Sequence, residues 1–277
     1  MFKIRPDCRP KDLSRDINRI LDRFSGILFP EKCVKCGRYI TVKRPGEVVP
    51  GPEAFLPYFC PSCLEATGYD PFLPPFCSFC GMKFQGDDLR NHPCGNCMAA
   101  PPDAGRVRAA GMYDGVMKEA VHLLKYSGRI ILSRPLGALM LDAYTLYFPS
   151  LSHPLLVPVP LHSSKLKHRG FNQSYLLARE LRRRSVSKEC GSSAFTIDCR
   201  SLIRVRKTPS QTEFSIEQRK RNVKDAFHVA KPEKIRGRCI LLVDDVYTTG
   251  ATCREAARTL LKAGAEAVDT IVAARAF

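Results

Sequence analysis

The stretch Ile240-Leu-Leu-Val-Asp-Asp-Val-Tyr-Thr-Thr-Gly-Ala-Thr252 decides how this chain folds. Its first four residues are all apolar, which is typical of a parallel strand that is covered on both faces. Two carboxylates follow the apolar run, and a turn rich in hydroxyl groups comes next. Gly250 has no side chain, so the backbone of this turn can close around a phosphate at the start of a helix. The stretch therefore predicts a strand, a turn that binds a sugar phosphate, and a helix.

The helix after the turn is well marked, because apolar residues recur at helical spacing from Cys253 to Leu261 and Gly264 supplies a stop. Asp244 and Asp245 are expected beside the anion, where carboxylates suit ribose hydroxyls and a magnesium ion. Two adjacent acids at a buried strand end have little structural use, since burying charge is costly. This pair is therefore the first candidate for a functional site.

Helical and strand patterns alternate from residue 106 to the C-terminus. Strands separated by helices predict an α/β fold with a parallel sheet and helices on its faces. Ligands of such sheets gather at the carboxyl ends of the strands, where the two acids are expected. The predicted strands are residues 106–113, 155–161, about 196–204, 240–243 and 268–273, and the predicted helices are residues 116–126, 131–147, about 172–184, about 217–226 and the helix that ends before Gly264.

The length and composition of the chain indicate its domain organisation and its location. At 277 residues the chain exceeds a typical single domain, so we expect an amphipathic helix in residues 1–30, a cysteine-rich unit in 31–105 and the α/β domain in 106–277. Mixed charges opposite the apolar stripe of the first helix favour packing on the protein over a membrane surface. No stretch approaches the roughly 18 apolar residues of a membrane span. The start lacks the apolar segment of a signal peptide, so we expect a cytoplasmic protein.

Eight of the 13 cysteines form four C-x-x-C pairs. In a reducing compartment such pairs indicate metal binding rather than disulfides, and two pairs complete a closed tetrathiolate zinc site. A single pair could be a redox motif, and four thiolates also hold iron–sulfur clusters, but the regular repetition and the spacing favour zinc. The pairs are Cys33 with Cys36, Cys60 with Cys63, Cys77 with Cys80, and Cys94 with Cys97.

A glycine follows the first pair (Gly37) and the third pair (Gly81) but not the other two, which indicates that one zinc-ribbon unit is repeated. We therefore predict sequential sites, with the first two pairs on one ion and the last two on another; an interleaved cross-brace is the alternative. The proline-rich spacers, residues 45–57 and 71–75, are expected to build no core, so that metal holds this region together. The remaining cysteines are expected to be packing or surface thiols: Cys8, Cys190, Cys199, Cys239 and Cys253.

The segment Val243-Asp-Asp-Val-Tyr-Thr-Thr-Gly-Ala-Thr252 resembles the phosphoribosyl pyrophosphate (PRPP) motif of type I phosphoribosyltransferases. The resemblance implies the type I phosphoribosyltransferase fold, with Asp244 and Asp245 bound to the ribose hydroxyls. It also implies that the 5-phosphate is held by Thr248, Thr249, Gly250, Ala251 and Thr252.

Further segments are similar to the ComF/GntX family of phosphoribosyltransferase-like proteins, notably Leu124-Lys-Tyr-Ser-Gly128 and Lys167-His-Arg-Gly-Phe-Asn-Gln-Ser174 downstream of the cysteine-rich front. This resemblance implies magnesium-dependent transfer of a phosphoribosyl group from PRPP, with pyrophosphate as the leaving group and an acceptor that the sequence does not identify. The family includes proteins associated with natural transformation. It therefore also implies handling of single-stranded DNA together with competence proteins.

Positive charge is concentrated in residues 161–224, which carry 16 Lys and Arg against 5 Asp and Glu, a net of +11 out of the formal +17 of the chain. Such an excess favours an anionic partner. By the resemblance, Arg169, Lys207 and Arg219 neutralise pyrophosphate as it leaves. His162 and His168 are candidates for a general base by location alone.

Two other interpretations of this charge stay open. The basic side chains could form a solvated face. They could instead track the phosphates of single-stranded DNA in a non-catalytic protein whose PRPP site is regulatory or relict, although few aromatic residues accompany them for base stacking.

Overall fold

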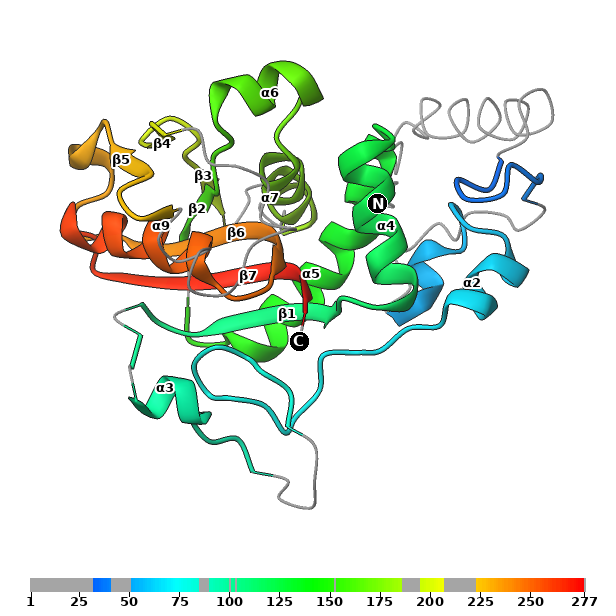
Figure 1. The fold of residues 1–277 in the computed structure, drawn as a ribbon, viewed down its shortest axis with the longest axis horizontal. Helices are drawn as coiled ribbons and strands as arrows, with labels where there is room; N and C mark the ends of the chain where they lie inside the picture. The colour runs from blue at the N-terminus through cyan, green and yellow to red at the C-terminus, as the bar shows by residue number, and fades with distance from the viewer. Residues whose placement is uncertain are drawn as a thin grey trace, which may run out of the picture.

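The structure, a computed structural model, describes residues 32–40, 51–84, 90–99, 101–102, 104–151, 153–185, 195–206 and 223–276. Its centre is a five-stranded sheet in the order β1-β7-β6-β2-β3, in which every pairing is parallel (Figure 1). The predicted parallel α/β architecture is therefore confirmed. The strands are β1 (Val107–Met112), β2 (Leu155–Pro158), β3 (Thr196–Ile197), β6 (Cys239–Tyr247) and β7 (Ala267–Arg275).

Strand β6 lies in the middle of the sheet because its apolar run is covered on both faces, and residues 240–243 are at most 1% exposed. The strand is longer than the sequence predicts. It continues through Asp244 and Asp245 as far as Tyr247, because β7 pairs beside it up to Arg275. The two acids therefore lie within a paired strand, near its carboxyl end.

Helices cover both faces of the sheet (Figure 1). On one face, α4 (Gly115–Tyr126), α5 (Ser133–Tyr147) and α7 (Gln173–Arg184) share a core with Leu241 and Val243. On the other face, α9 (Ala251–Lys262) shares a core with Ile240 and Leu242. The side chains of β6 thus alternate between the two cores. The remaining elements are η2 (Ile130–Leu132), α6 (Ser163–Arg169), η4 (Pro232–Lys234), and the antiparallel pair β4 (Leu202–Arg204) and β5 (Phe227–Val229).

Two predicted elements are divided in the structure. The predicted helix 131–147 is the short helix η2 followed by α5, whose first turn contains Pro135, a residue that has no N–H to donate and therefore suits a helix start. The predicted strand 196–204 is β3 followed by β4. These two strands are separated by a turn in which the Asp198 carboxylate accepts backbone N–H groups from Arg200 and Ser201, each at 2.8 Å.

Other differences concern helices. Helix α6 lies between the predicted strand 155–161 and the predicted helix that begins at about residue 172, where the sequence pattern predicts no helix. The predicted helix at about 217–226 lies largely outside the described residues, and the predicted helix in residues 1–30 lies wholly outside them. Within the part of the chain that the structure describes, no helix is long and apolar enough to cross a membrane.

The cysteine-rich region packs against the α/β domain through η1 (Gly51–Phe55), α2 (Pro61–Thr67) and α3 (Gly95–Ala99). Figure 1 shows α2 beside α4, and α3 on the β1 side of the sheet. The expectation that the proline-rich spacers build no core was wrong. Phe55 and Phe72, one in each spacer, are at most 3% exposed, and Phe72 stacks on Phe76 with 4.6 Å between ring centroids while both rings form T-shaped pairs with Tyr147. The turns bring these phenylalanines onto α5, so the spacers extend the core of the α/β domain.

Candidate functional site

Asp245 is held by an ion pair with Lys125, the penultimate residue of α4. The Lys125 ammonium nitrogen lies 2.9 Å from Asp245 Oδ1, and the two side chains are 18% and 5% exposed. Burial by itself lowers the pKa of Lys125, but the charge of Asp245 and the hydrogen bond to it raise that pKa above its ordinary value. Lys125 is therefore a cation at the pH of the cell, and it fixes the carboxylate in place.

Asp244 is held by a different set of groups. Its Oδ1 accepts hydrogen bonds from the Ser174 hydroxyl at 2.8 Å and from the backbone N–H of Asp245 at 2.9 Å, and its Oδ2 accepts one from the Cys253 thiol at 3.6 Å. Burial and the neighbouring charge of Asp245 raise the pKa of Asp244 to about 6, although the Ser174 hydrogen bond opposes this shift. Two carboxylates in contact thus share one buried site with only one lysine paired to them among the described residues.

The segment 248–252, called the loop below, is the turn after β6 together with the first two residues of helix α9. Gly250 is the N-cap of α9 and has a φ of +78°. A Cβ at this position would overlap the Tyr247 hydroxyl, so both the backbone angle and the close approach require glycine. The N-terminus of a twelve-residue helix faces the loop, and such ends favour anions.

Two buried polar atoms of this site lack a partner among the described residues. They are Asp245 Oδ2 and Thr249 Oγ1. Leaving a buried oxygen unsatisfied costs about 1–3 kcal/mol, and native proteins avoid this cost except where another group supplies the bond. Both atoms belong to the predicted site, one on its carboxylate pair and one on its loop. A ligand bound at this position would supply the missing hydrogen bonds.

Several cationic side chains act on one another, and one of them, Arg204, also feels the charge of Asp244. Burial lowers the pKa of Lys165, a half-buried residue of α6, and the charges of Arg204, Arg169 and Lys125 lower it further. Burial also lowers the pKa of Arg204, while the charge of Asp244 opposes that shift. These side chains lie close enough to repel one another, a cost that a polyanion bound between them would remove.

The residues predicted from sequence fall into three groups. Asp244, Asp245 and the loop 248–252 lie together at the carboxyl end of β6, as described above. Arg169 lies nearby, but it donates to Gln173 Oε1 at 2.7 Å and its guanidinium carbon lies 5.7 Å from the centre of the Tyr126 ring. Lys207 and Arg219 lie outside the described residues.

The two histidines have ordinary surroundings. His162 is the N-cap of α6, and its Nδ1 accepts the backbone N–H of Ser164 at 3.3 Å. His168 is exposed. Neither observation assigns a general base.

Sequence reasoning missed three side chains of this site: Lys125, Lys165 and Ser174. Lys125 and Ser174 stand inside the two family segments quoted above, so those segments were the available signal. Lys165 had none beyond the general excess of basic residues.

The eight paired cysteines form two groups: Cys33, Cys36, Cys60 and Cys63, and Cys77, Cys80, Cys94 and Cys97. This is the sequential grouping, and within each group all ligand atoms lie within 4.8 Å of one another. The second group is entirely buried, whereas Cys36 of the first is exposed.

The sulfur positions fit a tetrahedral zinc ion. Cys36 Sγ lies 3.7 Å from Cys60 Sγ, and Cys80 Sγ lies 3.7 Å from Cys94 Sγ. Thiolates placed about 2.3 Å from zinc at tetrahedral angles are about 3.8 Å apart. Hydrogen bonds from Arg38 lower the pKa of Cys36 to about 6, which favours the thiolate form that a metal requires.

Comparison with known proteins agrees with this arrangement. The phosphoribosyl transferase domain family matches residues 170–276. The chain is 36% identical over 213 residues to "DNA utilization protein YhgH" of Escherichia coli (strain K12), an alignment that covers 76% of this chain and 87% of the relative. It is 29% identical over 211 residues to "Competence protein F" of Haemophilus influenzae, which covers 73% and 85% of the two chains. It is 30% identical over 157 residues to "Competence protein ComFC" of Bacillus subtilis, which covers 57% and 58%.

The chain has a parallel sheet whose central strand carries two adjacent acids near its carboxyl end and is followed by a glycine-containing loop. Together with the domain family that matches residues 170–276, this arrangement defines a phosphoribosyltransferase-type α/β domain. Taken with the cysteine-rich front and the extent of the similarity to YhgH, these findings show that the chain belongs to the ComF-type family of phosphoribosyltransferase-like proteins.

Proposed function

We propose that this chain binds PRPP with magnesium and transfers its phosphoribosyl group to an acceptor. The observation that carries the proposal is the pair of unsatisfied buried oxygens, Asp245 Oδ2 and Thr249 Oγ1. One lies where the resemblance implies a ribose and the other where it implies a phosphate. A ligand that carries hydroxyl donors next to a phosphate would satisfy both.

In this proposal the loop 248–252 and the N-terminus of α9 hold the 5-phosphate, because backbone N–H groups and hydroxyls there can donate to its oxygens. Asp244 and Asp245 accept hydrogen bonds from the two ribose hydroxyls. Their carboxylate oxygens are also the type of ligand that magnesium prefers. When bound, magnesium would offset negative charge on the pyrophosphate.

The chemical step needs little from a base. The bond between C1 of the ribose and the pyrophosphate oxygen breaks, the bonding electrons leave with pyrophosphate, and an electron pair of the acceptor forms the new bond to C1. The chain must therefore stabilise negative charge on the leaving group. We assign this task to Lys165, Arg169 and Arg204, because the charges of Arg169 and Arg204 both act on Lys165 and the charge of Asp244 acts on Arg204. Lys207 and Arg219 remain predictions for the same task.

The two cysteine groups complete the proposal as structural zinc sites. Four thiolates per group leave no open position for substrate, as in closed structural sites. Zinc-bound thiolates are typical of a reducing compartment, where disulfides are rare, and this supports a location in the cytoplasm.

Calorimetric titration of magnesium and PRPP into the zinc-loaded protein tests the proposal. Wild type is expected to bind, and the double variant Asp244→Asn/Asp245→Asn is expected to lose binding. The matched control is Glu233→Gln/Glu266→Gln, which removes the same charge from two exposed acids outside the site. If metal-replete wild type does not bind PRPP, the enzyme proposal is wrong.

A second function is favoured by the relatives, whose names refer to DNA utilization and competence. We propose that the basic segment 161–224 binds single-stranded DNA, with PRPP as a regulatory ligand and competence proteins as partners. The last turn of α7, Arg182, Arg183 and Arg184, is a described part of this segment. Binding of a labelled oligonucleotide should weaken steeply with salt, because phosphate contacts release counterions. Affinity that is independent of salt would contradict this role.

A further inference from the structure

Arg275, the last residue of β7, is almost fully buried, with 6% of its surface exposed. Its guanidinium donates to the backbone carbonyls of several segments. Nε donates to Cys80 O at 3.2 Å, and Nη1 donates to Tyr247 O at 3.2 Å, to Thr248 O at 2.9 Å and to Ala276 O. All four acceptors are main-chain atoms, so this side chain fixes backbone positions rather than pairing with an acid.

These carbonyls belong to two separate parts of the candidate site. Cys80 is a member of the second cysteine group, and Thr248 is the first residue of the phosphate loop. The guanidinium carbon also lies 5.0 Å from the centre of the Tyr247 ring. The Tyr247 ring packs against the loop, since its hydroxyl leaves no room for a side chain at Gly250. The same hydroxyl accepts a hydrogen bond from Arg254 at 3.3 Å.

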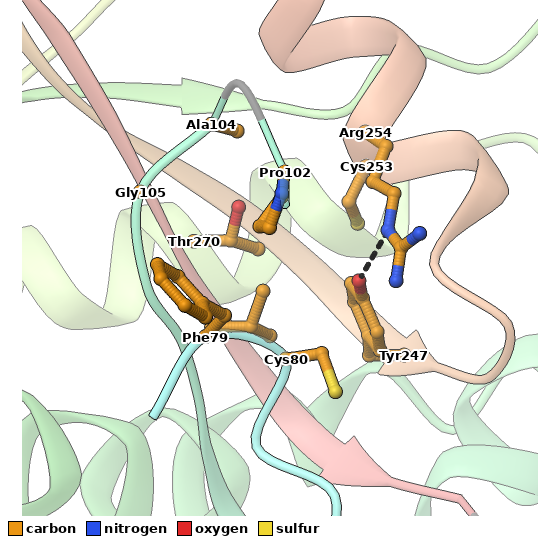
Figure 2. A pocket seen from close by; sticks show the side chains of 10 residues that line it. Phe79, Cys80, Pro102, Ala104, Gly105, Tyr247, Cys253, Arg254 and Thr270 are labelled. Carbon is orange, nitrogen blue, oxygen red and sulfur yellow. Dashed lines mark hydrogen bonds between the residues drawn. The ribbon is translucent and has the colours of Figure 1, made fainter. Parts of the chain in front are cut away.

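The second cysteine group is docked at the same place. The backbone N–H of Val107 on β1 donates to Phe79 O at 2.7 Å, so the turn between Cys77 and Cys80 is tied to the edge strand of the sheet. Phe79 and Cys80 also line a small cavity with Tyr247 and Arg254, and Figure 2 shows the first two residues on one side and the last two on the other. The metal-binding turn and Tyr247, which precedes the phosphate loop, thus line the same cavity, and Arg275 links the turn to the loop.

We infer that Arg275 is a positioning residue through which metal in the second cysteine group sets the geometry of the phosphate loop. Metal bound to the four thiolates would keep the turn 77–81 in the conformation seen here, and the position of the Cys80 carbonyl would then be fixed. Arg275 then spans from this carbonyl to those of Tyr247 and Thr248. Without metal the Cys80 carbonyl is free to move, and the loop loses a point of support. The inference about ligand affinity rests on the proposed binding of PRPP.

Hydrogen–deuterium exchange of the full-length protein tests this coupling without any ligand. Chelation of metal from wild type should accelerate exchange in residues 248–254, and re-addition of zinc should reverse the effect. Arg275→Gln should show accelerated exchange even when loaded with metal, and chelation should add little in this variant. The expected acceleration is about tenfold or more, which corresponds to the loss of one charge-assisted hydrogen bond.

The matched control is Arg106→Gln. Arg106 is also a bridging arginine, which pairs with Asp269 at 3.2 Å near the start of β7, far along the strand from the loop. Exchange in 248–254 should be unchanged in this variant. If Arg275→Gln exchanges like wild type, or if chelation accelerates the loop equally in both proteins, Arg275 does not carry the coupling.

Calorimetry with magnesium and PRPP separates this inference from the proposed function. If wild type binds, Arg275→Gln should bind about tenfold or more weakly, whereas Arg106→Gln should bind as wild type does. An unchanged affinity in Arg275→Gln would overturn the inference. Failure of wild type to bind PRPP would refute the proposed function alone, since the exchange measurement still decides whether the loop responds to the metal.

Discussion

Replacing Lys125 with methionine removes the cation that pairs with Asp245 at 2.9 Å. Removing one member of a buried ion pair costs roughly 3–5 kcal/mol. We expect the free energy of unfolding to fall by about 3 kcal/mol, the lower end of this range, because 18% of the Lys125 side chain reaches solvent. At about 2–4 °C per kcal/mol for domains of similar size, Tm should fall by about 6–12 °C.

The cost should depend on pH. The charge of Lys125 lowers the pKa of Asp244, so without it this pKa rises above its value of about 6. A carboxyl whose pKa in the folded state exceeds that in the unfolded state loses stability as it ionises. The variant should therefore be closest to wild type below about pH 4, near the ordinary pKa of aspartate, and should lose stability as the pH rises through the folded-state pKa.

Urea unfolding between pH 4 and pH 8 checks this reasoning in wild type, Lys125→Met, Asp245→Asn and the double variant. Asp245→Asn should restore most of the stability lost in Lys125→Met, because it removes the charge that was left unpaired. The control is Lys118→Met, which changes an exposed lysine of the same helix. If Lys125→Met matches Lys118→Met at pH 8, or if its loss is equal at pH 4 and pH 8, the ion pair does not contribute as argued.

Three further predictions concern the loop, the carboxylates and the core. The affinity for magnesium and PRPP, measured by calorimetry, should fall as the pH is lowered through about 6, because Asp244 with that pKa loses its charge there; a flat profile from pH 5 to pH 8 would contradict this. Gly250→Ala should weaken PRPP binding about tenfold or more, since a Cβ there displaces Tyr247, whereas Gly237→Ala, at a similar φ of +65° but in open space, should cost only the backbone strain of about 1–2 kcal/mol and leave affinity unchanged. Phe55→Ala should lower the free energy of unfolding by about 3–5 kcal/mol, because Phe55 is 0% exposed; a cost below about 1 kcal/mol in urea unfolding would mean that this spacer adds nothing to the core.

The sequence alone determined the local elements of the protein. The apolar run 240–243, the acids after it and Gly250 specify a strand, a loop and a helix, because backbone sterics and side-chain periodicity act within a few residues. The spacing of the cysteines likewise indicated four metal-binding turns. The sheet class followed from the alternation of these patterns, although the predicted strand 196–204 was divided because Asp198 satisfies the backbone of a turn there.

Only the tertiary structure decided which side chains surround the acids. Lys125 meets Asp245 of strand β6 from helix α4, and Ser174 meets Asp244 across 70 residues of chain. Arg275 joins Cys80 to the loop across 195 residues. No periodic pattern marks such contacts, because each depends on how two distant segments pack. The same reason explains Phe55: its proline-rich surroundings predict a loop, but the burial of its ring is set by the helices that it meets.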